Sequence, residues 1–308
     1  MKKKDLLTVH DLTREEIERL LERSAWLKKA RKDGTVHHPL TGRSLGMIFE
    51  KSSTRTRVSF EVGMFQLGGQ ALFLSPADLQ MGRGEPVADT ARTLSRYLDG
   101  IMIRTFSQRM VEELAQHATI PVINGLTDLH HPCQALADLF TIQEQHRRLQ
   151  GLRFAYIGDG NNMAHSLIEA CVAVGMHVAL ACPAGYEPDA GIMREAKQTA
   201  GRTGADLMLT GDPRKAAKDA DVVYTDVWAS MGQEKEHALR VKAFAGYQVD
   251  EKLMKLASPE ALVMHCLPAH RGEEISAEIL DGPRSVVWDE AENRLHVQKA
   301  ILEILVGK

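Results

Sequence analysis

Apolar residues along the chain form two kinds of pattern: short uninterrupted runs, and longer segments in which they recur every three or four positions. The first longer segment starts after Thr13, which forms a capping box with Glu16 ahead of an apolar helical face that begins at Ile17. Short runs then follow between further helical segments, at residues 45–49, 71–74, 101–103 and 121–123. This alternation predicts βαβ units and a parallel sheet.

A second series of apolar runs alternates with helical segments in the same way. Its members lie at residues 153–157, 177–182, 206–210, 221–225, 261–266 and 285–289. Residues 135–151 between the two series have a strongly helical pattern, and a last helix is expected from about Ala291. The sequence therefore predicts an α/β fold of two doubly wound domains, each with a parallel central sheet flanked by helices, and a boundary near residue 148.

The composition narrows the class of protein. A chain of 308 residues exceeds one ordinary core, and 44% hydrophobic with 26% charged residues is typical of a soluble globular protein. The formal net charge of −3 gives no general attraction for nucleic acid or for an anionic membrane, so we expect neither as a partner. Any anion-binding site must therefore be local.

The cysteines and the apolar stretches indicate in which cellular compartment the protein resides. Four cysteines without CxxC spacing argue against a zinc ribbon and a disulfide framework, and fit a reducing cytosol. The N-terminal residues carry positive charge but lack the apolar core of a signal peptide. The most apolar stretch, residues 170–184, is too short and too interrupted to span a bilayer. We therefore expect a cytoplasmic protein.

Unusual polar clusters follow the predicted strands, where βα loops gather. They are SSTRT at 52–56, Arg104, HHPCQ at 130–134, GDGNN at 158–162, DVWASMG at 226–232 and HCLPAHRG at 265–272. Ligands of doubly wound sheets bind outside the carboxyl ends of the strands. The shared position of these clusters predicts an enzyme active site.

The cluster at 52–56 is suited to a phosphate group. Ser53, Thr54 and Thr56 supply hydroxyls at the start of a predicted helix, whose N–H groups and dipole already favour an anion. Arg55 adds a forked guanidinium. A simpler interpretation takes Ser53 as a helix cap and pairs Arg57 with a glutamate four residues later, but it leaves this density of anion-seeking groups unexplained. The sequence does not match the GxxxxGK[ST] pattern of a P-loop.

The HHPCQ cluster offers donors for a carbonyl oxygen that gains negative charge. His131 and Gln134 flank a proline that restricts the local turn, and a neutral imidazole and a carboxamide can both donate to an oxyanion. Arg104 at the end of its strand is a candidate for a second guanidinium. Each residue taken alone is compatible with a packing role or with surface exposure. A shared functional site is favoured because all three residues are expected at one sheet edge.

The GDGNN cluster is an incomplete dinucleotide-binding pattern. The third glycine position is Met163, and the next strand does not end in the acidic residue that a ribose requires. Asn161 and Asn162 instead offer amide groups to a small polar ligand.

The last two clusters add a carboxylate and a thiol. Asp226 can hold an ammonium group while Met231 lines an apolar stem, although a helix-capping role for Asp226 fits the local sequence equally well. Cys266 and His270 are conceivable as a nucleophilic pair, but no oxyanion motif of a thiol hydrolase accompanies them.

Together these motifs resemble the carbamoyltransferase family and, within it, the ornithine branch. STRTR at 53–57 and HPCQ at 131–134 are typical of the whole family, whereas DVWASMG and HCLP at 265–268 are typical of the branch. With AENR at 291–294, the matches cover nearly the whole chain in order. The resemblance implies a carbamoyl-phosphate-binding domain at 1–147, completed by a C-terminal helix at 292–308, and an ornithine-binding domain at 148–291.

The resemblance also implies the site residues. Those implied to bind carbamoyl phosphate are Ser53, Thr54, Arg55, Thr56, Gln80, Arg104, His131, Gln134, Cys266, Leu267 and Arg294. Those implied to bind ornithine are Asn162, Asp226, Ser230 and Met231. The implied catalytic residues are Arg104, His131, Gln134, Asp226 and Cys266. The peptide bond between Leu267 and Pro268 is expected to be cis.

The implied reaction transfers the carbamoyl group of carbamoyl phosphate to the δ-amine of L-ornithine, giving L-citrulline and phosphate. It belongs to arginine biosynthesis or, in reverse, to arginine catabolism, and it needs no metal or organic cofactor. The resemblance also implies assembly as a homotrimer or a multiple of trimers, although some family members are dimers.

Two alternatives remain open at this point. One is a carbamoyltransferase for another amine, such as putrescine or N-acetylornithine, against which the D-x-x-x-S-M-G sequence argues. The other is a non-catalytic phosphate-binding module, against which the set of His131, Gln134 and two arginines argues.

Overall fold

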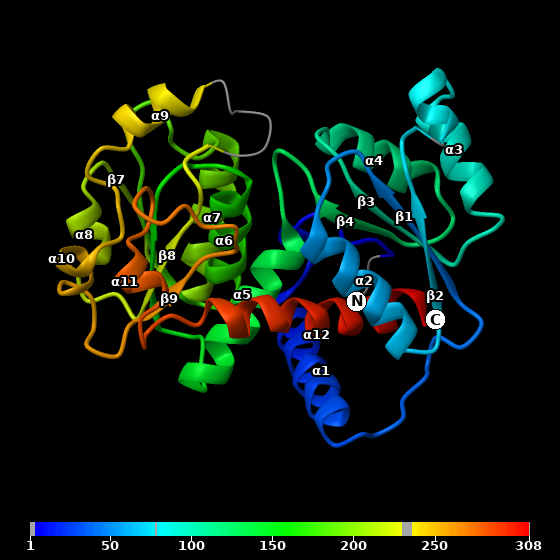
Figure 1. The fold of residues 1–308 in the computed structure, drawn as a ribbon, viewed down its shortest axis with the longest axis horizontal. Helices are drawn as coiled ribbons and strands as arrows, with labels where there is room; N and C mark the ends of the chain where they lie inside the picture. Colours follow the sequence, from blue (N-terminus) through cyan, green and yellow to red (C-terminus); the bar gives the residue numbers. More distant parts are fainter. Residues whose placement is uncertain (1–3, 78, 230–235, 308) are drawn as a thin grey trace. The chain divides into compact units, whose positions relative to one another are not determined.

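The computed structural model describes residues 4–77, 79–229 and 236–307 (Figure 1). The chain divides into two compact units, unit 1 with residues 1–140 and 292–308 and unit 2 with residues 141–291. The division falls inside α5 (Pro132–His146), and α12 (Val287–Val306) also has residues in both units. No helix in the described part of the chain is long and apolar enough to cross a bilayer.

Unit 1 is built on a parallel sheet of four strands in the order β2-β1-β3-β4. The strands are β1 (Ser44–Phe49), β2 (Gln70–Leu74), β3 (Gly100–Arg104) and β4 (Val122–Leu126). Its other elements are η1 (Val9–Asp11), α1 (Arg14–Lys32), α2 (Thr54–Gln66), η2 (Gln80–Arg83), α3 (Val87–Leu94) and α4 (Gln108–His117). The capping box expected at the start of α1 is confirmed, because Thr13 and Glu16 bond reciprocally.

Alternation along the strands divides the core of unit 1 between two faces. Ile101 and Ile103 pack with the apolar side chains of α3 and α4 on one face. Gly100 lies on the other face, where a Cβ at that position would come within 2.9 Å of Val306 in α12. Arg104 shares that face, because side chains two and four residues apart in a strand point the same way. The guanidinium of Arg104 is therefore directed to the side of the sheet that α12 covers.

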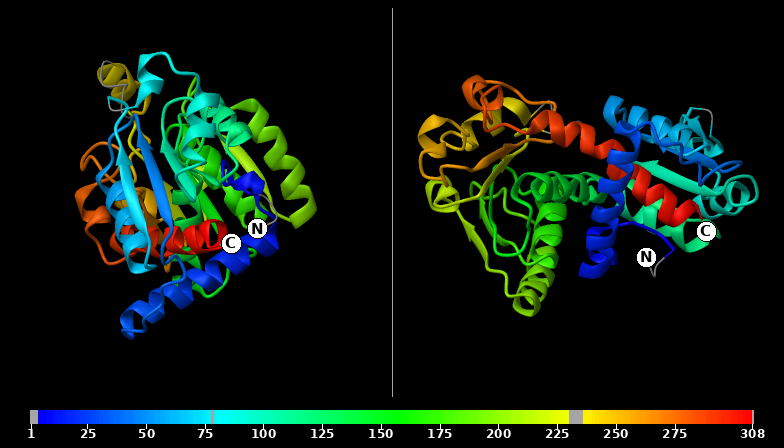
Figure 2. Two further views of the ribbon diagram at one scale, coloured as in Figure 1. Left: turned by 90° about the vertical axis from the view of Figure 1, so that its right-hand side faces the viewer. Right: turned by 90° about the horizontal axis from the view of Figure 1, so that it is seen from below.

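The last helix is packed between the first two helices of unit 1. Lys28 in α1 bonds Asn293 at 2.8 Å, and Lys299 in α12 bonds Gln66 in α2 at 3.0 Å. Gly63 of α2 faces α12, since a Cβ at this position would lie at ordinary van der Waals distance, 3.4 Å, from the side chain of Lys299. Figures 1 and 2 show α12 running beside α1 and α2.

Unit 2 contains a parallel sheet of five strands in the order β7-β6-β5-β8-β9. The strands are β5 (Arg153–Ile157), β6 (His177–Ala181), β7 (Leu207–Thr210), β8 (Val222–Thr225) and β9 (Leu262–Met264). The helices are α6 (Asn162–Ala173), α7 (Ala190–Thr203), α8 (Pro213–Ala217), α9 (His237–Ala243), α10 (Glu251–Met254) and α11 (Ala277–Leu280). Ala155 and Ile157 pack on the face covered by α8, α10 and α11, while Tyr156 stacks on Tyr224 on the other face.

One predicted strand is wrong. Residues 285–289 are predicted to extend the second sheet, but the segment forms only an isolated bridge between Ser285 and Val263, with the N–H of Val286 donating to the carbonyl oxygen of Val263, and Val287 already begins α12. The apolar side chains of this segment lie instead at the start of a helix. The prediction failed because a short apolar run does not distinguish a strand from the buried start of a helix. The last helix consequently begins four residues before the expected Ala291.

Both sheets contain a point where the strand order reverses. In unit 1 the chain adds β2 on one side of β1 and β3 on the other, and in unit 2 it adds β6 and β8 on opposite sides of β5. Ligands of such sheets bind outside the carboxyl ends of the two strands that flank this reversal. In unit 1 those ends lead to Ser53 and contain Arg104, and in unit 2 they lead to Asn161 and Asp226.

Candidate active site

The start of α2 carries both a structural cap and exposed polar groups. The side-chain oxygen of Ser53 accepts a hydrogen bond from the N–H of Thr56 at 3.2 Å. Arg57 pairs with Glu61 at 3.0 Å and lies 3.9 Å above the ring of Phe73. The simpler interpretation therefore holds for these two residues. Thr54 remains exposed and Arg55 half-exposed on the first turn, which contains no acidic residue and so favours an anion.

Arg294 joins two of the predicted residues in the interior of unit 1. Its Nη1 donates to Oε1 of Gln134 at 2.7 Å, and its Nη2 donates to Oγ1 of Thr56 at 2.8 Å. Gln134 also donates to Oδ1 of Asp138 at 2.8 Å, one helical turn further along α5. The guanidinium thus holds side chains of α2 and α5 in one cluster that is almost fully buried.

His131 is neutral within this cluster. Its side chain is 5% exposed, and its burial is the main reason why its pKa lies well below the usual 6.5. The positive charges of Arg294, Arg104 and Arg55 lower the pKa further. A neutral imidazole that experiences the charges of three guanidiniums offers an N–H donor without adding another buried charge.

The neighbouring Cys133 is not a nucleophile. It is buried, its thiol donates to the carbonyl oxygen of Asn124 at 3.4 Å, and burial raises its pKa to about 12. A thiol in this state does not provide a thiolate near neutral pH.

Gln80 lies apart from these groups. It begins the exposed turn η2, and no hydrogen bond joins its side chain to Ser53, Arg55 or Arg104 among the residues that the structure describes. The structure brings together Thr56, Arg104, His131, Gln134 and Arg294, but it does not bring Gln80 to them.

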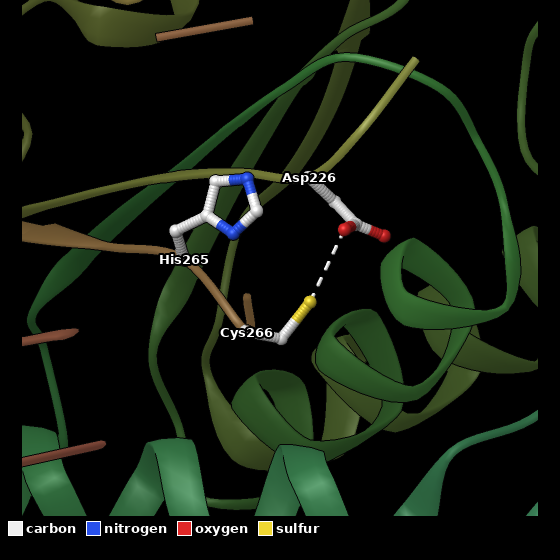
Figure 3. Close-up of side chains that lie close together, drawn as sticks. All are labelled: Asp226, His265 and Cys266. Atoms are coloured by element: carbon white, nitrogen blue, oxygen red, sulfur yellow. Dashed lines mark hydrogen bonds between the residues drawn. The ribbon is translucent and has the colours of Figure 1, made fainter. Parts of the chain in front are cut away.

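In unit 2, Asp226 follows β8 and is held by donors from two other loops. Its Oδ2 accepts from Nδ2 of Asn161 at 2.9 Å, and its Oδ1 accepts from the thiol of Cys266 at 3.1 Å. Figure 3 shows the Asp226 and Cys266 side chains pointing toward one another. Cys266 is therefore a hydrogen-bond donor here, which argues against a thiolate nucleophile.

The Asn161 contact was missed from the sequence. Asn161 caps α6 by accepting from the N–H groups of Met163 and Ala164, and its amide group then reaches Asp226. The adjacent Asn162, which was assigned to the ligand, is the first residue of the helix and is half-buried. The two adjacent asparagines of GDGNN indicate two polar side chains in this loop. They do not indicate which of them caps the helix and contacts Asp226 and which is left for the ligand.

His265 supports the loop that carries Cys266. Its Nδ1 accepts the N–H of Leu267 at 2.9 Å, which leaves the proton on Nε2, and Nε2 lies 3.2 Å from Oε1 of Glu274. The cis peptide bond expected between Leu267 and Pro268 is confirmed. Asp226, His265 and Cys266 have potential metal-ligand atoms within 4.8 Å of one another. Both imidazole nitrogens are engaged, however, so this trio does not suit a metal ion.

A buried ion pair holds the segment that follows Asp226. Arg240 in α9 donates to Asp159 at 2.7 Å and to the carbonyl oxygen of Trp228 at 2.9 Å. Burial raises the pKa of Asp159 to about 6, and the charge of Arg240 opposes this rise. Ser230 and Met231, which were assigned to the amino-acid substrate, lie outside the described residues.

The arrangement of these side chains suits two kinds of ligand group, an anion with a carbonyl oxygen in unit 1 and an ammonium group in unit 2. The start of α2 with Arg55 and Arg104 can hold a phosphate, and a neutral His131 beside it can donate to a carbonyl oxygen. The carboxylate of Asp226 can hold an ammonium group.

Comparisons with known proteins agree with these two chemistries. Residues 4–144 match the model for the aspartate/ornithine carbamoyltransferase carbamoyl-P binding domain, and residues 150–305 match the model for the Asp/Orn binding domain. An ornithine carbamoyltransferase of Syntrophus aciditrophicus is 60% identical over 304 residues, which is 99% of this chain and 100% of the relative. One of Anoxybacillus flavithermus is 60% identical over 306 residues, 99% of this chain and 98% of the relative.

Solved structures give the same result. The ornithine carbamoyltransferase from Pyrococcus furiosus has a TM-score of 0.96 and 55% identity, covering 98% of this chain and 97% of that one. The anabolic ornithine carbamoyltransferase from Campylobacter jejuni has a TM-score of 0.92 and 43% identity, covering 98% and 99%. With both of its units matched in sequence and in fold, the chain belongs to the aspartate/ornithine carbamoyltransferase family.

Proposed function

We propose that this protein is an enzyme with ornithine carbamoyltransferase activity, which transfers the carbamoyl group of carbamoyl phosphate to the δ-amine of L-ornithine. The products are L-citrulline and phosphate, as required in arginine biosynthesis or, in reverse, in arginine catabolism. The observation that carries the proposal is the buried cluster in which Arg294 binds Thr56 and Gln134 beside a neutral His131. Unit 1 binds carbamoyl phosphate and unit 2 binds ornithine.

The phosphate group of the donor binds at the start of α2. Ser53, Thr54 and Arg55 contact its oxygens together with the N–H groups of the first helical turn, and Arg104 adds a second guanidinium. These positive groups stabilise the phosphate as its bond to the carbonyl carbon breaks and it leaves with the bonding electron pair.

The carbonyl oxygen of the donor becomes negatively charged when the amine attacks. His131 donates its N–H to this oxygen, and Thr56 and Gln134 stand beside it because Arg294 holds both side chains. Preorganised donors of this kind lower the barrier because they need no rearrangement as the charge develops.

Ornithine binds through its α-amino group. Asp226 accepts the α-ammonium, with Asn162, Ser230 and Met231 as further contacts, and the backbone of Cys266 and Leu267 serves both substrates. Since a protonated amine has no lone pair, the δ-amine must be neutral when it forms the new C–N bond, and holding the α-ammonium fixes its position for attack.

Incubation with carbamoyl phosphate and each candidate amine tests the function. We expect citrulline from L-ornithine and no carbamoylated product from putrescine or N-acetylornithine, because neither offers Asp226 a free α-ammonium. Carbamoyl putrescine or N-acetylcitrulline as the main product would contradict the proposed substrate. Phosphate-sensitive binding without turnover of any amine would instead favour a binding module.

We further propose that the protein assembles as a homotrimer or a multiple of trimers through an apolar surface on α2 and β2. This surface consists of Val58, Phe65 and Phe73, whose exposed fractions range from 40% to 78%. β2 is an edge strand of its sheet, and apolar side chains on such an edge are typical of an association surface. The exposed Gln80 would then reach the site of a neighbouring copy. The cytoplasmic localisation expected from the sequence stays a prediction.

A further inference from the structure

The loop that follows β9 carries imidazole and carboxylate groups that have no part in the proposed reaction. His270 and Glu273 are the first and last residues of a turn closed by a 2.9 Å hydrogen bond from the N–H of Glu273 to the carbonyl oxygen of His270, and Glu274 follows directly. These three side chains have potential metal-ligand atoms within 4.8 Å of one another. Nδ1 of His270 lies 3.9 Å from Oε2 of Glu273 and 3.9 Å from Oε2 of Glu274.

Glu274 is an unusual member of this group because its side chain is 0% exposed. Its Oε1 lies 3.2 Å from Nε2 of His265 and accepts the N–H of His270 at 2.5 Å. Its Oε2 is buried and has no hydrogen-bond partner among the residues that the structure describes. A buried carboxylate oxygen is costly unless a donor or a cation satisfies it. A cation between this oxygen and the ring of His270 would satisfy it.

A fourth side chain comes from α9. His237 is the first residue of that helix, and its Nε2 lies 3.1 Å from each carboxylate oxygen of Glu273. The His237, His270 and Glu273 side chains are 47%, 48% and 32% exposed, so an ion can enter from solvent.

We propose that His237, His270, Glu273 and Glu274 bind one divalent transition-metal ion, with Zn²⁺ as the expected ion. Two imidazoles and two carboxylates form a ligand set that Zn²⁺ accepts, with ligand atoms about 2.0–2.2 Å from the metal. Around a tetrahedral ion such atoms lie roughly 3.4 Å apart. The separations of 3.9 Å between His270 and each carboxylate therefore require only small side-chain movements, whereas His237, which contacts Glu273 at 3.1 Å, has to move further toward the ion.

Titration of the whole protein with Co²⁺ and Zn²⁺ tests the site. We expect one Co²⁺ per chain, with the visible bands of a four-coordinate ion and without a thiolate-to-metal charge-transfer band, because no ligand is a thiol. Zn²⁺ should compete for the same site and raise the unfolding temperature, since the site does not exist in the unfolded chain.

Substitutions then assign the ligands. His270→Ala and Glu273→Gln change partly exposed side chains, and each should weaken Zn²⁺ binding by about 10-fold or more. His177→Ala is the matched control, because His177 is also partly exposed and pairs with an acidic residue, Asp206, at 3.1 Å in the same unit. Cys266→Ala should leave Zn²⁺ binding unchanged. Binding that survives His270→Ala but disappears in Cys266→Ala would overturn the proposal, as would the absence of saturable binding of both ions.

Discussion

Asp226 has two carboxylate oxygens that face different partners. Oδ2 accepts from Asn161 at 2.9 Å, while Oδ1 accepts from the N–H of Val227 at 2.8 Å and from the thiol of Cys266 at 3.1 Å. All three donors favour a negatively charged acceptor at this position. These hydrogen bonds orient the Asp226 side chain before a substrate binds. A substitution that keeps its shape and removes its charge therefore tests the contribution of the charge.

Asp226→Asn should raise the KM for ornithine by roughly 10- to 100-fold, the effect of losing one charge-assisted hydrogen bond of about 1.5–3 kcal/mol. The KM for carbamoyl phosphate should stay within about 2-fold of the original, since the phosphate site lies in another set of residues. Asp221→Asn is the control, because Asp221 precedes the same strand and binds the N–H of Arg153 at 2.8 Å. Steady-state kinetics with each substrate varied in turn measures the effect, and equal losses for both substrates would refute the assignment.

Arg55 and Arg57 provide a matched pair on one helical turn. Arg55→Ala should weaken carbamoyl phosphate binding by about 10-fold or more, because it removes a guanidinium from the proposed phosphate site. Arg57→Ala should change it by less than about 2-fold, because Arg57 is engaged with Glu61 and Phe73. Calorimetric titration of both variants with carbamoyl phosphate compares them. Near-normal affinity in Arg55→Ala would remove Arg55 from the site.

At the scale of secondary structure, α12 combines a site residue with a structural role in unit 1. Arg294 in this helix reaches Thr56 and Gln134, and residues on its later turns pack on α1 and α2. His296 lies between these two regions and is fully buried. Burial lowers the pKa of His296 to about 4, although a hydrogen bond with Glu292 opposes this change.

The buried His296 makes stability depend on pH. Above about pH 6.5 the ring is neutral in the folded and unfolded chains; below it, only the unfolded chain takes up the proton until the pH approaches about 4. The free energy of unfolding should therefore fall by up to about 1.4 kcal/mol per pH unit in this window because of His296 alone. His131 adds to the fall in the same direction.

Urea unfolding between pH 7 and pH 4.5 measures this dependence. His296→Gln should reduce the slope of unfolding free energy against pH by up to one proton, whereas the control His10→Gln, at an exposed position, should leave it unchanged. An identical slope in the His296 variant would show that the ring does not remain neutral in the folded protein.

At the scale of the whole molecule, the parallel sheets of both units reverse their strand order at the first strand of the unit. Strands are added to β1 and to β5 first on one side and then on the other, and Ser53, Arg104, Asn161 and Asp226 lie at or just after the carboxyl ends of the strands that flank these reversals. The chain passes from unit 1 to unit 2 within α5 and returns within α12. The apolar surface on α2 and β2 belongs to unit 1 alone, so its role in assembly can be tested without altering unit 2.

Phe65→Glu together with Phe73→Glu should dissociate the proposed trimer into monomers, because a carboxylate cannot be buried at an apolar interface without a partner. Light scattering coupled to gel filtration measures the mass. Tyr97→Glu is the control, since Tyr97 is 74% exposed but lies outside this surface. An unchanged mass in the double variant would place the interface elsewhere, and a monomeric parent protein would exclude the trimer.

Much of the fold could be predicted from the sequence, because apolar periodicity reports which face of a helix or strand is buried. Nine of the ten predicted strands occur, and the polar clusters follow them as expected. The failure at residues 285–289 has a physical cause, since a short apolar run satisfies a buried strand and a buried helix start equally well. The capping box at Thr13 succeeded because its two hydrogen bonds are local.

The same distinction applies to the candidate active site: its chemical groups could be predicted from the sequence, and their contacts could not. The sequence by itself determined which residue types stand at the strand ends, because hydroxyls, guanidiniums and carboxylates keep their chemistry wherever the chain carries them. Only the tertiary structure decided that Arg294 meets Gln134 across 160 residues of chain and that His131 is neutral. Those outcomes depend on burial and on long-range contacts, and neither is encoded in a local pattern of residues.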